Sequence, residues 1–340
     1  MSFSNTFDTT NTGSAVSNRE DLTDVLTILA PEETPVLSSA NKSKASATNV
    51  EWTVDSLSAP TTAGISEGAD VTAFTDQFAS RARLGNRIQK FRRDFMVSDL
   101  QDAVDSVGPA KIAQAEAKAI RELKRDVEAT LIGTQDKATE NGAGVANALR
   151  GLGRWLSANV ADTDVPAAYR TPAASIYTAA EAGAAPFTES TLNDLITSVF
   201  TVTGNTNSLM LVADTGLRRV VSDFARFGAN VQDGTNAGVR TVNYEGGSGT
   251  IKLSVDLYES DHGVVSIVNG NPDCMPNFGG NTANSSGYLV NPEYYGVHEL
   301  IPMGTSRLPN LGGGERGFVD CALTLGVYHP GAHGLIEDVT

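Results

Sequence analysis

The sequence contains only two cysteines, Cys274 and Cys321, among its 340 residues. Two cysteines are too few for a disulfide framework or a cysteine-rich zinc site, so we expect two buried, reduced thiols. Histidine is also scarce. His329 and His333 have helical metal-pair spacing, but the Pro-Gly dipeptide that follows His329 excludes a helix there. No acidic cluster with ligand spacing accompanies them, so we expect no metal and no cofactor.

Long apolar runs and an excess of basic residues are both missing. No apolar stretch reaches ~18 residues, so we expect no membrane-spanning segment. The first 20 residues lack a basic start followed by an apolar core, so they do not form a signal peptide. The formal net charge is −15 and the sequence pI is about 4.7. A surface of that charge does not wrap nucleic acid, because phosphate binding needs clustered Lys and Arg.

Motifs for catalysis are incomplete wherever they begin to form. Gly142 and Gly144 imitate the start of a dinucleotide fingerprint, but Asn147 breaks it and no predicted strand precedes it. The run Gly246-Gly-Ser-Gly lacks the lysine of a phosphate loop. Ser248 is not in a nucleophile elbow, because the elbow's second glycine is missing. We therefore predict no catalytic residue and no enzyme activity.

The clearest pattern that is present is a long amphipathic helix from Pro109 to Leu131. Apolar residues fall three or four apart, as at Ala119, Leu123 and Val127, and no glycine or proline interrupts them. Pro109 suits a first helical position because its missing N–H needs no partner there. At 1.5 Å rise per residue the helix is roughly 35 Å long, enough to support a sheet.

Residues 48–98 form a second distinct block. Val50, Trp52 and Val54 alternate with polar residues, which predicts a half-exposed strand. Residues 56–80 are turn-rich, and Arg81 to Val97 reads as one long returning strand with a bulge at Gly85. A two-stranded ribbon has little core of its own and must lie on another surface.

The returning strand concentrates basic residues in an otherwise acidic chain. A solvated strand face explains this concentration, and so does docking onto an acidic surface, of which another copy of the chain is the nearest. On the second interpretation, the inter-subunit contact residues are Arg81, Arg83, Arg87, Lys90, Arg92 and Arg93, together with Trp52.

The rest of the chain alternates short helices and strands. A polar arm over residues 1–20 cannot bury itself. Helix–strand–helix order after residue 187 predicts an inserted α/β subdomain, and we find no internal repeat. Helices are predicted at 21–29, 189–203 and 215–227, strands at 209–212, 288–301 and 317–328, and a hairpin at 250–268.

Several short motifs occur in a fixed order along nearly the whole chain. They are Glu33-Thr-Pro-Val-Leu, Glu51-Trp-Thr-Val-Asp-Ser-Leu with Glu67-Gly-Ala-Asp, Arg83-Leu-Gly-Asn, Glu122-Leu-Lys-Arg-Asp-Val-Glu, and the ending Leu323-Thr-Leu with His329-Pro-Gly-Ala-His-Gly-Leu-Ile. As a set, these motifs resemble the tailed-bacteriophage major capsid proteins of the Hong Kong ninety-seven-type fold. The resemblance implies an α+β phage major capsid fold with an N-arm, an extended β-ribbon E-loop, a P-domain with a long spine helix, and an A-domain.

This resemblance implies boundaries for each part. The N-terminal arm is expected at 1–40, the E-loop ribbon at 41–98, the P-domain at 99–186 with its spine helix at 109–132, the A-domain at 187–286, and return strands at 287–340.

The implied function is self-assembly into pentamers and hexamers of an icosahedral phage head that encloses double-stranded DNA. The implied partners are further copies of the chain, a portal, scaffold or cement proteins, and packaged DNA bound without sequence specificity, with no membrane. The location is the virion, after assembly in the host cytoplasm. Two other classes stay open: another self-associating virion protein, such as a tail tube or decoration protein, and an α/β enzyme or ligand-binding protein.

Overall fold

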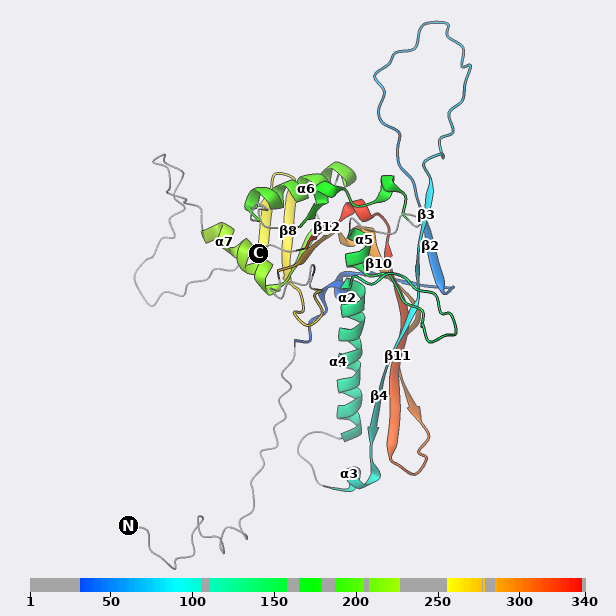
Figure 1. The fold of residues 1–340 in the computed structure, drawn as a ribbon, viewed down its shortest axis with the longest axis vertical. Helices are drawn as coiled ribbons and strands as arrows, with labels where there is room; N and C mark the ends of the chain where they lie inside the picture. The colour runs from blue at the N-terminus through cyan, green and yellow to red at the C-terminus, as the bar shows by residue number, and fades with distance from the viewer. Residues whose placement is uncertain are drawn as a thin grey trace, which may run out of the picture.

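A long helix beside one sheet and a second sheet covered by two helices make up the body of the molecule (Figure 1). The computed structural model describes residues 31–104, 111–157, 165–178, 187–204, 208–226, 256–276, 278 and 285–337. The predicted arm over 1–20, the predicted helix at 21–29 and Pro109 lie outside these residues.

The long helix α4 spans Lys111–Ile132, which confirms the helix predicted from the apolar periodicity. Ala119, Leu123 and Val127 are buried, as that periodicity predicts, because they share one helix face. This face packs against strands β4 (Gln89–Val97) and β11 (Glu315–Val327). The helix therefore supports the first sheet along its length (Figure 1).

The first sheet has the strand order β1-β10-β11-β4. The long strands β10 (Tyr295–Leu308) and β11 form an antiparallel hairpin, and β4 continues the antiparallel pairing on the other edge of β11. The short strand β1 (Asn41–Lys44) runs parallel to β10. The register between β10 and β11 shifts on either side of Ile301, which marks a bulge in the sheet.

The second sheet has the order β5-β12-β9-β6-β8-β7 and is mixed. Helices α6 (Glu189–Thr203) and α7 (Thr215–Arg226) pack against it with a core of their own. The strands are β5 (Ile176–Tyr177), β12 (Gly334–Ile336), β9 (Gly287–Val290), β6 (Met210–Ala213), β8 (Gly263–Asn269) and β7 (Leu257–Ser260).

Local sequence signals account for the ends of α6, whose predicted bounds match the structure. Thr188 caps the N-terminus in a capping box with Thr191, which satisfies donors that a helix start leaves free. Gly204 follows the last turn with φ +67°, a left-handed conformation that favours glycine. The hairpin predicted at 250–268 is confirmed for β7 and β8, while residues 250–255 lie outside the described residues.

The predicted long returning strand is wrong as one element, because it is two strands with different partners. β3 (Ala82–Arg87) pairs with β2 (Asn49–Val54), whereas β4 pairs with β11 in the first sheet. The chain changes partner at Ile88, whose N–H donates to the Thr48 carbonyl at 2.9 Å. The β2–β3 register is also continuous through Gly85, so the predicted bulge there is wrong as well.

Short helices complete the secondary structure of the described residues. They are α2 (Pro35–Ser39), α3 (Asp99–Ala103), α5 (Leu152–Leu156) and 3-10 turns at Ala167–Tyr169, Ala173–Ser175, Pro292–Tyr294 and Pro330–Ala332. Over the described ranges, no helix is long and apolar enough to cross a membrane.

Candidate assembly surfaces

The base of the β2–β3 ribbon is fastened to the body by Asn86. Its side-chain amide donates to the Leu325 carbonyl at 2.8 Å and to the Arg150 carbonyl at 3.0 Å. Its side-chain oxygen accepts the backbone N–H of Arg150 at 2.8 Å and that of Arg87 at 2.9 Å. Asn86 is fully buried, so each of these bonds replaces one that water no longer supplies.

Trp52 lies in an aromatic cluster of its own chain. Its ring centroid is 5.8 Å from that of Trp155, 6.0 Å from that of Tyr328 in an edge contact, and 6.5 Å from that of His298 in a stacked one. These are favourable aromatic distances. Trp52 therefore joins the ribbon to the body without a second copy being required to explain its position.

Four of the six basic residues on the returning strands form ion pairs within the chain. The pairs are Arg81 with Asp55 at 3.2 Å, Arg83 with Glu51 at 3.2 Å, Lys90 with Asp320 at 3.0 Å and Arg93 with Asp126 at 2.5 Å. Arg92 lies over the Phe318 ring at 5.9 Å, and neither it nor Arg87 has an ion pair among the described residues. Ion pairs with carboxylates of the same chain thus explain most of the clustering of Arg and Lys on these strands. The predicted contact with a neighbouring copy stays a prediction.

The loop between β2 and β3 has the opposite character. Residues 56–80 project away from the body and are exposed throughout (Figure 1). They carry three carboxylates, on Glu67, Asp70 and Asp76, and no Lys or Arg. Large apolar side chains are exposed among them, including Leu57 at 99% and Phe74 at 92%. The projecting surface is therefore acidic and apolar, rather than basic.

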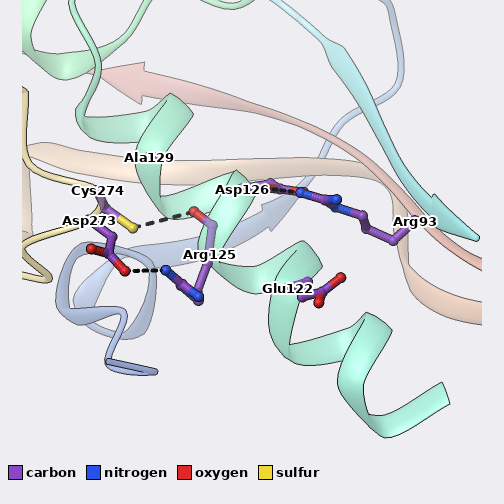
Figure 2. A pocket seen from close by; sticks show the side chains of 7 residues that line it. All are labelled: Arg93, Glu122, Arg125, Asp126, Ala129, Asp273 and Cys274. Atoms are coloured by element: carbon purple, nitrogen blue, oxygen red, sulfur yellow. Dashed lines mark hydrogen bonds and ion pairs between the residues drawn. The ribbon is translucent and has the colours of Figure 1, made fainter. Parts of the chain in front are cut away.

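A charged pocket of about 300 Å³ lies between α4, β4 and the turn at Asp273 (Figure 2). Arg93 binds Asp126 through two nitrogens, at 2.5 and 2.7 Å, and the neighbouring carboxylate raises the pKa of Arg93. Arg125 pairs with Asp273. Burial raises the pKa of the Cys274 thiol to about 11, so the thiol stays protonated and unreactive. Glu122 and Ala129 complete the wall.

The arrangement in Figure 2 suits structural ion pairs better than chemistry. Each guanidinium already faces a carboxylate, so neither arginine is left to hold a substrate anion. No group of three or more His, Cys, Asp or Glu that could hold a metal occurs in the part of the chain that the structure describes. His333 is fully buried and its Nδ1 accepts the Asn291 N–H at 3.1 Å, a structural role, and burial lowers its pKa to about 4.

The segment entering the body at residues 31–39 is held on α4 by a buried carboxylate. Glu128 accepts the backbone N–H of Val36 at 2.9 Å and that of Leu37 at 2.8 Å, one on each oxygen. Burial raises the pKa of Glu128 to about 7 against the opposing effect of these two bonds.

Outside this buried contact, an ion pair and further hydrogen bonds hold the same segment. Arg121 pairs with Glu32 at 3.1 Å. The Asn271 amide donates to the Pro31 and Glu33 carbonyls at 3.2 and 3.1 Å. Ser39 and Tyr295 share a hydrogen bond of 2.6 Å.

Sequence reasoning missed the residues that fasten these segments, namely Asn86, Glu128 and Asn271. The sequence pattern groups Glu128 with the charged face of α4, and the structure instead buries it three residues before the buried Leu131. The short spacing to Leu131 is the one signal that could have indicated a buried role. For Asn86 and Asn271 the sequence carries no such signal, because asparagine is ordinary in turns and at strand ends.

Comparisons with known proteins agree on the fold. The structure is similar to the capsid asymmetric unit of cyanophage A-1(L), with a TM-score of 0.62, 15% identity, and coverage of 97% of this chain and 99% of that one. It is also similar to the capsid of cyanophage P-SCSP1u, with a TM-score of 0.58, 14% identity, and coverage of 96% and 94%. The capsid of an empty GTA particle gives a TM-score of 0.58 at 14% identity, with 98% and 99% covered.

Sequence comparison identifies the family. No curated protein sequence matches the chain. The family model described as SU10 major capsid protein matches residues 4–340. Because that match spans nearly the whole chain, the protein belongs to the SU10 major capsid protein family, whose members are structural proteins of phage heads.

Proposed function

We propose that copies of this chain assemble into pentamers and hexamers of an icosahedral phage head that encloses double-stranded DNA. The observation that carries the proposal is the exposed loop 56–80, whose large apolar residues have no core in a single chain. A surface of this kind marks an interaction site. Membership of a major capsid protein family makes other copies of the chain the natural partner.

The loop then lies over a neighbouring copy. A contact between the loop of one copy and the body of the next joins two different surfaces, which is a heterologous interface. Repeated around a ring, such an interface closes after a fixed number of copies. This is the geometry that rings of five and six require.

The parts of the shell subunit follow the boundaries inferred from the resemblance, with one change. We assign the N-arm to 1–40, the P-domain to 99–186, the A-domain to 187–286 and return strands to 287–340. For the E-loop, predicted at 41–98, the pairing of β4 with β11 favours ending the ribbon near Ile88. Residues 89–97 then belong with the sheet that α4 supports.

The six basic residues of the returning strands differ in whether they already have an ion pair within their own chain. Arg87 and Arg92 are the candidates for contact with a neighbour's carboxylates, because they have no ion pair among the described residues. Arg81, Arg83, Lys90 and Arg93 would have to exchange an existing partner. Interfacial charges of this kind fix register more than they add affinity.

The net charge of −15 supports weak contact with packaged DNA. An acidic inner wall repels phosphate, so DNA can be packed and released without sequence-specific binding. A portal and scaffold or cement proteins complete this proposal, with assembly in the host cytoplasm. The virion location follows from the family.

Electron microscopy of the purified full chain over a range of protein concentrations tests the proposal. Closed shells, or rings of five and six, are expected. A triple variant, Leu57→Ser, Ile65→Ser and Phe74→Ser, should remain small while keeping its circular dichroism spectrum. The matched control changes Thr62, Thr72 and Thr75 to Ser in the same loop and should assemble. A uniform monomer or dimer for the unaltered chain, or shells unaffected by the triple variant, would contradict the proposal.

A further inference from the structure

A small apolar pocket opens on the body where α4 meets the first sheet. It has a volume of about 190 Å³, and its apolar lining includes Leu37, Ile301, Met303 and Leu323. The strand register shifts on both sides of Ile301, and such a bulge re-aims the side chains around it. Ile301 is 41% exposed, so this apolar surface is not fully covered within the described chain.

The size of the pocket suits one aromatic side chain. A dry, apolar cavity of roughly 150 Å³ is known to accept a benzene ring. The pocket is smaller than the roughly 300 Å³ at which small-molecule sites begin. An inserted side chain therefore fits it better than a free ligand does.

The charged residues that line the pocket are Lys42, Lys124 and Glu299, so lysines outnumber carboxylates there. Lys42 already pairs with Glu299 at 3.3 Å, whereas Lys124 forms no ion pair within the residues described. An occupant that combines an apolar side chain with a nearby carboxylate would satisfy both the lining and Lys124.

The loop 56–80 carries that combination at Phe74 and Asp76. Phe74 is 92% exposed and makes no ring contact among the described residues, whereas the Phe78 ring already lies under Arg81 at 4.4 Å. Phe74 and Asp76 lie two residues apart in a fully exposed stretch, so a single docking surface can reach both side chains. One carboxylate oxygen of Asp76 accepts the Phe78 N–H at 2.9 Å, and the other oxygen has no hydrogen bond among the described residues.

The loop and the pocket of one chain lie on different parts of the molecule. The ribbon directs the loop away from the body (Figure 1). The pocket is lined instead by residues of α2, α4 and β10. The pairing therefore needs two copies. We propose that Phe74 of one copy inserts into the pocket formed by Leu37, Ile301, Met303 and Leu323 of a second copy, with Asp76 facing Lys124. This inference rests on the assembly proposed above and names its anchor.

Photo-cross-linking of the full chain tests the anchor directly. A p-benzoylphenylalanine in place of Phe74, in assemblies mixed from light and isotope-labelled copies, should cross-link to the segment 301–303 of another copy. The same probe in place of Ile65, which is 89% exposed in the same loop, is the control and should yield few such products. Assemblies whose cross-links from position 74 lie elsewhere would overturn the pocket while leaving the assembly proposal intact. A chain that never assembles would contradict both.

A double-mutant cycle gives an independent reading. Phe74→Ala should raise the protein concentration needed for assembly by roughly tenfold or more, as expected of a buried aromatic anchor. Asp76→Asn keeps the turn and removes the charge, and it should raise that concentration by roughly two- to fivefold. Lys124→Gln should raise the concentration needed for assembly by the same factor as Asp76→Asn. The variant that combines Asp76→Asn with Lys124→Gln should need no higher concentration than either single variant. Additive effects of the two charge changes would contradict the Asp76–Lys124 contact.

Discussion

The Glu128 carboxylate, on the buried face of α4, accepts the backbone N–H of Val36 at 2.9 Å across 92 residues of sequence. A lone buried carboxylate is costly unless hydrogen bonds stabilise its charge. Here two backbone donors do so in part, and burial still raises the pKa of Glu128 to about 7. The attachment of the segment at residues 31–39 to α4 should therefore depend on pH through Glu128.

The first prediction concerns the pH dependence of stability. The pKa of Glu128 is raised in the folded chain from a usual value of 4.5 to about 7. The contribution of Glu128 to the free energy of unfolding is thus fully present below pH 4.5 and is lost as pH rises through 7. The total loss is about 3 kcal/mol. The free energy of unfolding of Glu128→Gln should not decrease in this way between pH 5 and pH 8. At pH 5 the variant should be less stable than the unaltered chain, because one backbone N–H then faces an amide donor.

Urea unfolding of the unassembled chain at pH 5 and pH 8 measures this effect. Other titrating groups are common to both proteins, so the difference between them isolates Glu128. The control, Glu122→Gln, removes a carboxylate from the more exposed side of the same helix and should keep the slope of the unaltered chain. Parallel profiles for Glu128→Gln and the unaltered chain would refute the assignment.

The second prediction concerns the attachment of the ribbon. Asn86→Ala removes the four hydrogen bonds that this buried side chain makes, leaving the Leu325 and Arg150 carbonyls without these donors. We expect the free energy of unfolding to fall by about 2–4 kcal/mol. Amide hydrogen exchange should rise in β2 and β3 while α4 stays protected.

Arg83→Gln is the matched control for this prediction, because Arg83 lies on the same strand in an exposed ion pair. It should change the free energy of unfolding by less than about 1 kcal/mol. Equal effects of the two changes would mean that Asn86 does not fasten the ribbon.

The third prediction separates two roles for Trp52. In the single chain it packs on Trp155, His298 and Tyr328. Trp52→Ala should therefore lower the free energy of unfolding of the unassembled chain by about 2 kcal/mol. Trp52→Phe should lose less, because it keeps an aromatic ring. If neither change affects the unassembled chain and both impair assembly, Trp52 acts between copies as the sequence suggested.

The fourth prediction ranks the basic residues. Arg87→Gln and Arg92→Gln should leave the free energy of unfolding within about 0.5 kcal/mol, because no ion pair among the described residues is lost. Both should weaken assembly, and the salt dependence of assembly should decrease. Light scattering against salt concentration provides the measurement.

Arg93→Gln is the comparison for this ranking, since it removes the partner of Asp126 within the chain. The pair is half exposed, so its loss should cost at most about 1 kcal/mol of unfolding free energy. Shells that form equally well for Arg87→Gln and Arg92→Gln would show that these two residues do not contact a neighbour.

Family membership decides among the classes that the sequence left open. A tail tube or decoration protein was an alternative because it also self-associates. An α/β enzyme or ligand-binding protein was another, because a site can be built from residues scattered along the sequence. The family match over residues 4–340 identifies a major capsid protein instead. The α4 helix, long enough to support a whole sheet, was the local feature that already favoured this outcome.

The sequence by itself determined the elements whose signals are local. Apolar residues three and four apart specify α4, and Thr188 with Gly204 specifies the ends of α6, because those contacts join residues within a few positions. It also determined which positions of α4 lie inside, apart from the role of Glu128.

Only the tertiary structure decided which elements pair and what fastens them. Residues 81–97 read as one strand, since alternation along a chain does not reveal a change of partner at Ile88. Asn86 reaches Leu325 across 239 residues, and Arg93 finds Asp126 across 33. A buried amide or an ion pair depends on groups that folding brings together from distant positions. Their chemistry is visible in the sequence, but their partners are not.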